Sequence, residues 1–165
     1  GSANLWTRDT KEIRFDLDNI AAAAGQIGCS LLVRPHPSQG RSLHEAWLKT
    51  APPHVALAAD VPLYPLLRSV DAVVTYASTV SLETVLMQRP LVQLRYFPED
   101  NCVPLAEWQM AWQVTRPEHL ARVLREALTD DADWQRILER SRQLMPDGRA
   151  APKVADLVEK LAFSA

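Results

Sequence analysis

Short apolar runs of strand length alternate with amphipathic stretches of helical period along most of this chain, and this alternation limits the fold more than any other feature. Gly28 ends the first helical stretch, and the run 30–34 then closes at Pro35, as a strand buried on both faces does. The apolar face of that first helix repeats at spacings of four and three, through Ile13, Leu17, Ile20, Ala24 and Ile27.

The same alternation continues to the end of the chain. Strands are expected at 30–34, 54–58, 71–75, 90–96 and 111–114. Helices are expected at 13–27, 43–49, 63–69, 79–88, 104–110, 120–128, 131–145 and 154–161, with Thr115 and Glu118 forming a capping box before the sixth. We therefore predict an α/β, Rossmann-like fold: a doubly wound, mostly parallel sheet of about five strands with helices on both faces.

Length and charge narrow the class of protein. The 165 residues suffice for one domain, and the net charge of −2 argues against a nucleic-acid partner. We interpret Gly1-Ser2 as a cloning remnant and 3–165 as a single domain. Cys29 and Cys102 are expected to be free thiols in a reducing cytoplasm. No apolar stretch approaches the roughly 20 residues that a membrane-spanning helix needs.

The loop after the first expected strand reads Arg34-Pro35-His36-Pro37. Two prolines restrict the backbone around His36, so its imidazole is partly preorganised and can donate to a phosphate oxygen. The alternative is a rigid turn that happens to contain a histidine.

The loop after the third expected strand carries hydroxyls. Ser78 is the expected helix cap, and Ser78, Thr79 and Ser81 gather at a helix start, where N–H groups and the helix dipole favour anions. Glu83, one turn on, can accept hydrogen bonds from a ribose diol. The alternative is an ordinary serine-capped helix.

Both loops follow carboxyl ends of expected parallel strands, so they can converge on one crevice. An imidazole, hydroxyls and a diol acceptor suit a nucleotide sugar. A serine hydrolase is disfavoured because Ser78 lacks flanking glycines. A metal site at His36, His44 and Glu45 is disfavoured because the spacing fits no common site. Trp108 and Trp112 are either core residues or contacts to another domain.

Three segments carry a resemblance to a known family. They read LLVRPHPS, DVPLYPLLRSVDAVVTYASTVSLETVLMQRPLV and DGRAAPKVADLV. Over about Leu31–Leu161 the chain resembles the C-terminal, donor-binding domain of GT-B glycosyltransferases that build bacterial surface polymers, chiefly capsule polysaccharide, Kdo, polysialic acid and CDP-glycerol transferases. The Ser-x-x-x-Leu-Glu helix is also similar to that of lipid A disaccharide synthase.

The resemblance implies roles for individual residues. His36, Ser78, Thr79 and Ser81 would contact the donor phosphates, and Glu83 the ribose. Arg34 and Asp60 would border the base pocket or contact a phosphate, although many relatives have Lys in place of Arg34. The donor would be CMP-, CDP- or UDP-linked, with no cofactor and no metal, because the helix dipole and His or basic side chains stabilise the leaving phosphate.

The resemblance also implies what this chain lacks. The N-terminal GT-B domain, which supplies the acceptor site and the general base, is expected as a missing partner, so we assign no catalytic residue here. The full-length enzyme is expected to be cytoplasmic, with peripheral membrane association. Two alternatives stay open: half of a sugar-nucleotide 2-epimerase, and a non-catalytic Rossmann-like interaction domain.

Overall fold

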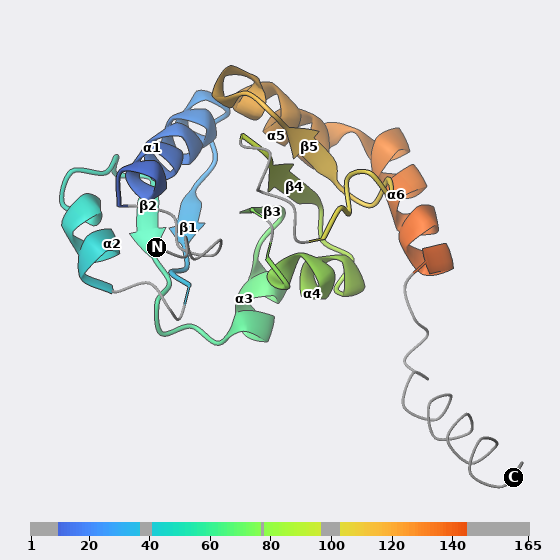
Figure 1. Ribbon diagram of the computed structural model, residues 1–165, viewed down its shortest axis with the longest axis horizontal. Helices are drawn as coiled ribbons and strands as arrows, with labels where there is room; N and C mark the ends of the chain where they lie inside the picture. The colour runs from blue at the N-terminus through green and yellow to red at the C-terminus, as the bar shows by residue number, and fades with distance from the viewer. Residues whose placement is uncertain (1–9, 37–40, 77, 97–102, 145–165) are drawn as a thin grey trace, which may run out of the picture.

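The computed structural model describes residues 10–36, 41–76, 78–96 and 103–144 (Figure 1). The expected helix at 154–161 and the thiol of Cys102 lie outside this part. The strands are β1 (Leu31–Val33), β2 (Val55–Leu57), β3 (Val73–Thr75), β4 (Leu91–Leu94) and β5 (Trp112–Val114). The helices are α1 (Thr10–Gln26), α2 (Arg41–Leu48), α3 (Leu63–Ser69), α4 (Val80–Leu86), the 3-10 helix η1 (Pro117–His119), α5 (Leu120–Thr129) and α6 (Asp131–Leu144).

All the described strand pairs are parallel, but they form two hydrogen-bonded sheets. β1 pairs with β2, with Leu31 opposite Val55. In the second sheet β4 lies between β3 and β5. In the view of Figure 1, β1 is the strand of its pair drawn nearer to β3. The predicted α/β, Rossmann-like fold with parallel strands and flanking helices is confirmed, and the five strands are divided between two sheets.

Helices cover both faces of the three-stranded sheet because its strands carry apolar side chains in both directions. Ala23 of α1 and residues of α5 and α6 pack on the face that holds Val92 and Leu94. On the opposite face, Val85 of α4 and residues of the 103–111 segment pack on Leu91. Fully burying a leucine side chain stabilises a fold by about 1.5–3 kcal/mol, so β4, buried at every residue, contributes strongly to this core.

A third cluster joins α1 and α2 to the smaller sheet through Leu17, Trp47 and Val55. Here the expectation of a strand buried on both faces is only partly met. Leu31 and Val33 pack against this cluster, whereas the side chain of Leu32 is 45% exposed. Side chains alternate between the two faces of a strand, and the face that carries Leu32 belongs to none of the three clusters.

The tryptophans in the described part of the chain divide between interior and surface. Trp47 and Trp112 are buried, and the rings of Trp112 and Trp134 stack with centroids 6.2 Å apart. These three are core residues. Trp108 is 44% exposed, so of the two residues for which an interface role was left open, only Trp108 presents its ring to solvent.

Two local predictions are wrong. Residues 104–110 form turns that end at Gln109, whose φ of 61° is left-handed and stops a helix. The capping box at Thr115 and Glu118 is also absent. Pro117 begins the 3-10 helix η1 instead, and neither Arg116 nor His119, at the two cap positions, makes a side-chain cap hydrogen bond.

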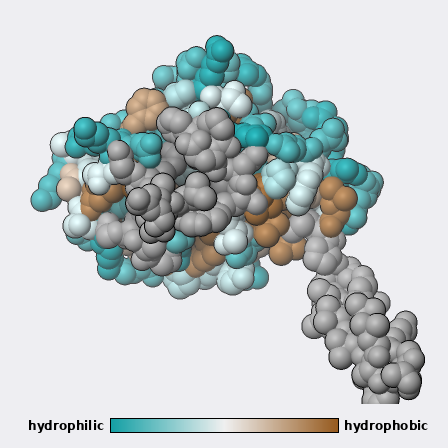
Figure 2. All heavy atoms as spheres, in the orientation of Figure 1, coloured by the Kyte–Doolittle hydropathy of each residue, from teal (hydrophilic) through white to brown (hydrophobic). Residues whose placement is uncertain are grey.

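Hydrophilic and hydrophobic side chains are unevenly spread over the face shown in Figure 2. Hydrophilic residues cover the top of this view, over α5, whereas a hydrophobic group lies at the upper left, over α1, and others lie lower down, toward α4 and α6. Among the residues that the structure describes, none of the helices has the length and apolar character needed to cross a membrane.

Candidate functional site

The predicted site residues all follow the carboxyl ends of strands. His36 comes three residues after β1, Asp60 three residues after β2, and Ser78 three residues after β3. Because the strands within each sheet are parallel, His36 and Asp60 both lie at the end of the smaller sheet where its strands finish. Ser78 lies at the equivalent, carboxyl end of the larger sheet. A single crevice shared by both sheets stays a prediction.

Ser78 supplies the capping oxygen of α4. Its Oγ accepts a hydrogen bond from the N–H of Val80 at 3.3 Å, and its carbonyl accepts from the N–H of Ser81 at 2.9 Å. Thr79 has helical dihedral angles, makes no side-chain cap hydrogen bond and is exposed. The first turn therefore presents the hydroxyl of Thr79 to solvent, beside a half-buried Ser78 that also holds the helix start in place.

Ser81 does not belong to this exposed group. Its side chain is fully buried, and its hydroxyl is directed toward the carbonyl of Tyr76 at 3.5 Å. Thr84, one turn on, is equally buried and donates to the carbonyl of Val80 at 2.8 Å. Residues three apart lie on one side of a helix. This side of α4 packs on the protein, so Ser81 offers no accessible hydroxyl to an anion.

Glu83 has an uncompensated carboxylate oxygen. Its Oε2 is buried and has no hydrogen-bond partner in the structure, although the residue as a whole is only half-buried. Leaving a buried acceptor without a donor costs about 1–3 kcal/mol, and more when the group is charged. Thr79 lies four residues earlier and so on the same side of α4. The hydroxyl and the carboxylate are therefore neighbours along one helix face.

The two residues proposed near a base pocket are held by different contacts. Arg34 is half-buried, and its Nε donates to the carbonyl of Val61 at 3.4 Å, which links the ends of β1 and β2. Asp60 is exposed and accepts a hydrogen bond from the guanidinium of Arg41 at 2.6 Å. That hydrogen bond, with the charge of Asp60, raises the pKa of Arg41 above its ordinary value.

Arg41 was missed by sequence reasoning although its position gave a signal. It is the first residue of α2, directly after the loop that follows β1, and it therefore lies at the same sheet edge as His36. His36 itself is exposed at that edge. Among the described residues, the carboxyl end of the smaller sheet thus carries the imidazole of His36, the guanidinium groups of Arg34 and Arg41, and the carboxylate of Asp60, and Oε1 of Glu45 lies 4.0 Å from Nε of Arg41.

A second group of polar residues lies at the carboxyl end of β4. Gln93 is 7% exposed; its Nε2 donates to the carbonyl of Val103 at 3.0 Å and its Oε1 accepts from the N–H of Ala106 at 2.9 Å. Arg95 pairs with Glu107 at 2.5 Å. The guanidinium of Arg95, whose side chain is 30% exposed, is therefore already paired with a carboxylate. The sequence signal for these two hydrogen bonds was a glutamine inside an otherwise apolar strand.

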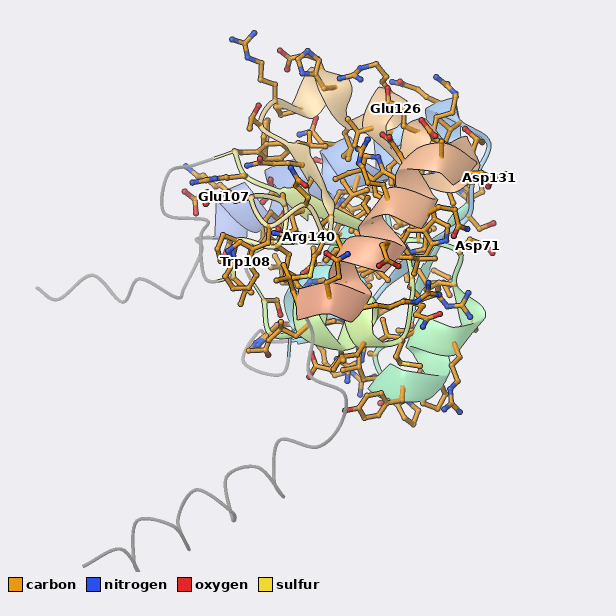
Figure 3. All side chains as sticks on the ribbon, turned by 90° about the vertical axis from the view of Figure 1, so that its right-hand side faces the viewer. Asp71, Glu107, Trp108, Glu126, Asp131 and Arg140 are labelled. Carbon is orange, nitrogen blue, oxygen red and sulfur yellow. The ribbon has the colours of Figure 1, made fainter. Side chains whose placement is uncertain are left out.

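Figure 3 shows the 103–111 segment from its outer side, with Glu107, Trp108 and Arg140 labelled near one another. The Nε of Arg140 in α6 donates to the carbonyl of Trp108 at 3.3 Å. The 103–111 segment is thus held by β4 on one side and by α6 on the other.

Two hollows in the described part of the chain lie away from the predicted site residues. A shallow groove of about 540 Å³ runs between α1 and the start of α5, lined by Phe15, Asn19, Ala22, Ala23, Gln26, Pro117, Glu118 and Ala121. A cavity of about 10 Å³, room for about one water molecule, lies beside Gln93 and Arg95. Neither contains a residue of the predicted site. Among the described residues, no three His, Cys, Asp or Glu side chains are arranged to hold a metal ion.

Known structures include one with the same fold. The chain is similar to part of Phytolacca americana UGT2, whose solved structure is a complex with UDP-2-fluoro-glucose and pterostilbene, with a TM-score of 0.58 and 18% identity. The similarity covers 90% of this chain and 39% of that one. At this identity it establishes a shared fold. No protein-family model and no curated protein sequence matches the chain.

Proposed function

We propose that this chain is the nucleotide-sugar donor-binding domain of a glycosyltransferase that makes a bacterial surface polysaccharide or glycolipid. Two independent lines support the proposal. The fold is shared with a protein solved in complex with a UDP-sugar analogue. The loops after β1 and β3 carry the residues on which the resemblance to GT-B transferases rests. The chain spans 39% of the similar structure, so acceptor binding and catalysis are assigned to the rest of the enzyme.

The observation that carries the proposal is the buried, unpartnered Oε2 of Glu83, one helical turn along α4 from the exposed residue Thr79. A carboxylate accepts two hydrogen bonds from the adjacent hydroxyls of a ribose, and such charge-assisted hydrogen bonds are stronger than neutral ones. Because Oε2 has almost no accessible surface, the half-buried side chain of Glu83 must turn outward before a donor nucleotide can supply the donors that Oε2 lacks. Its phosphates then lie at the helix start, within reach of hydroxyl donors.

The phosphate contacts are assigned to Ser78 and Thr79, not to the buried Ser81. α4 has seven residues, so its dipole is weak and the hydroxyls must provide most of the stabilisation. His36 is assigned to the far end of the diphosphate as a hydrogen-bond donor. Arg34 and the Asp60–Arg41 pair border the base. In the transferase, these donors would stabilise the negative charge that develops on the leaving nucleotide as the sugar departs.

Titration with UDP, CDP and CMP, followed by amide NMR shifts, tests the proposal. We expect saturable shifts at Ser78, Thr79 and Glu83 for at least one nucleotide. Glu83→Gln should weaken that binding by about 10–100-fold, because a hydrogen bond to a charged group contributes about 1.5–3 kcal/mol. Glu118→Gln, on the exposed η1 helix, is the matched control and should bind like the unaltered chain. Equal affinity for Glu83→Gln, or no saturable shift with any of the three, contradicts the proposal.

A further inference from the structure

Five consecutive apolar residues lie at the surface where the chain passes from β2 into α3. They are Val61, Pro62, Leu63, Tyr64 and Pro65, and all except the half-buried Leu63 are exposed. The side chain of Tyr64 is 57% exposed and that of Val61 is 39% exposed. A single exposed apolar residue is ordinary, but a run of them indicates a surface that contacts a ligand or a partner.

The run is held in one conformation without a ligand. Pro62 precedes α3 with φ −58° and ψ 145°, and its carbonyl accepts a hydrogen bond from the N–H of Leu66 at 3.1 Å. Pro65 in the first turn removes no helical hydrogen bond, because the first N–H groups of a helix have no partner within it. The buried side chains of Leu66 and Leu67 fix α3 to the protein. Tyr64 therefore stands on a support that loses little backbone freedom when a ligand binds.

This run lies at the carboxyl end of the smaller sheet. In Figure 1 the arrows of β1 and β2 point downward, and the chain that leads into α3 runs below them. In parallel α/β sheets, ligands bind beyond the carboxyl ends of the strands. Val61 is joined to the end of β1, because Nε of Arg34 donates to its carbonyl at 3.4 Å. Three residues of chain span at most about 11 Å, so Tyr64 lies near the guanidinium of Arg34.

Tyr64 and Arg34 together offer two kinds of contact to a flat ring. Aromatic side chains stack on the face of any base. The hydrogen bond to Val61 uses Nε of Arg34 and none of the four N–H groups on its two Nη atoms. A purely apolar partner surface would cover this charged group without supplying an acceptor, which is costly. A base supplies both an apolar face and a carbonyl oxygen at its edge, so a base fits this surface better.

We propose that Tyr64 is the platform on which the base of the donor nucleotide stacks, while Arg34 donates to a carbonyl oxygen at the edge of that base. The inference rests on the proposed function, which places the base near Arg34 and the Asp60–Arg41 pair but assigns no aromatic residue to it. Stacking on Tyr64 supplies affinity for the base, and the donors of Arg34 favour rings that carry a carbonyl oxygen, as uracil and cytosine do.

Ligands that differ only by the base test this position on the whole 165-residue chain. Uridine and cytidine 5′-monophosphates carry a base, and ribose 5-phosphate lacks one. We expect the nucleotide to shift the amide NMR signals of Val61 and Tyr64, and ribose 5-phosphate at the same concentration to leave them in place. If a nucleotide binds the chain and neither amide responds, the proposal is overturned.

Substitutions at Tyr64 measure the contribution of its ring. Tyr64→Ala should weaken nucleotide binding by about 5–150-fold, because stacking contributes about 1–3 kcal/mol per base. Tyr64→Phe keeps the stacking face and should bind within about twofold of the unaltered chain. Phe15→Ala removes an exposed aromatic ring from α1 and is the matched control, which should bind normally.

The stacking role and the proposed function fail in different ways. If Tyr64→Ala binds the nucleotide as tightly as the unaltered chain while Glu83→Gln binds it more weakly, the stacking role is overturned and the proposed function stands. Equal weakening in Tyr64→Ala and Tyr64→Phe, or in Tyr64→Ala and Phe15→Ala, also overturns the stacking role. If no nucleotide binds the unaltered chain, the proposed function fails and this inference fails with it.

Discussion

The two sheets differ in how completely they are buried. All residues of β4 are buried, and Leu91 and Val92 have no exposed side-chain surface. In the smaller sheet, Leu32 is 45% exposed and Ala56 of β2 is exposed as well. The larger sheet thus holds most of the chain's packed interior, while the smaller one carries charged side chains at its carboxyl edge. Stability is therefore expected to depend more on the larger sheet than on the smaller one, whereas the proposed ligand contacts follow the carboxyl ends of strands in both sheets.

The largest expected difference between the sheets is between two leucine truncations. Leu91→Ala removes a fully buried side chain from β4 and should lower the free energy of unfolding by about 2–5 kcal/mol. Leu32→Ala makes the same chemical change in β1, where the side chain is 45% exposed, and should cost about 1 kcal/mol or less. Urea unfolding followed by circular dichroism measures both. Equal costs would show that the smaller sheet is as well packed as the larger one.

The second-largest expected loss of stability is at Gln93 of β4, whose side-chain amide is hydrogen-bonded to the backbone of Val103 and Ala106. Gln93→Met keeps the side-chain volume but leaves the carbonyl of Val103 and the N–H of Ala106 without their partner. We expect a loss of about 1–3 kcal/mol in the free energy of unfolding. Gln135→Met, on the exposed side of α6, is the control and should change stability by less than about 0.5 kcal/mol. If the two variants are equally stable, the amide of Gln93 does not hold the 103–111 segment.

A smaller effect separates the two hydroxyls at the start of α4. Ser78→Ala removes the oxygen that accepts from Val80 and should destabilise the fold by about 0.5–2 kcal/mol. Thr79→Ala removes a hydroxyl that caps nothing and should leave thermal stability nearly unchanged. Nucleotide binding, in contrast, should weaken in both variants. A Thr79→Ala variant with normal nucleotide binding would remove Thr79 from the proposed site.

The smallest expected effect is at the edge of the smaller sheet. Asp60→Asn breaks an exposed ion pair with Arg41, and exposed pairs contribute little to stability. The pair raises the pKa of Arg41, so its contribution is complete below the ordinary arginine pKa and is lost only in strong alkali. Unfolding measured from about pH 5 to 9 should therefore show the same pH dependence for Asp60→Asn and the unaltered chain. If the two proteins differ in the pH dependence of unfolding within that range because Arg41 titrates there, the raised pKa of Arg41 is contradicted.

Much of the fold could be predicted from local pattern. The run 30–34 closed by Pro35 and the buried run around Leu91–Leu94 placed two strands, because strand length and flanking prolines are local features. The capping box failed for a local reason as well, since Pro117 at the start of a 3-10 turn competes with a cap at Thr115. The turn at Gln109 gave no sequence signal, because its left-handed φ belongs to a residue other than glycine.

Only part of the candidate site could be predicted from local sequence patterns. The sequence could predict that His36 and Ser78 follow the ends of strands, because the order of strands and loops follows directly from the order of residues. That Ser81 is buried while Thr79 is exposed depends on which side of α4 packs against the sheet. That Asp60 pairs with Arg41 and Gln93 with Ala106 depends on contacts between residues 19 and 13 positions apart.

By itself, the sequence determined the parallel α/β class and the strand ends at which polar residues collect, since periodicity and turn residues act over a few positions. Only the tertiary structure decided that the described strands form two hydrogen-bonded sheets, and that Oε2 of Glu83 is buried without a donor. Strand pairing and side-chain burial depend on how segments distant in the sequence pack together. The free energy of that packing cannot be inferred from a local sequence pattern.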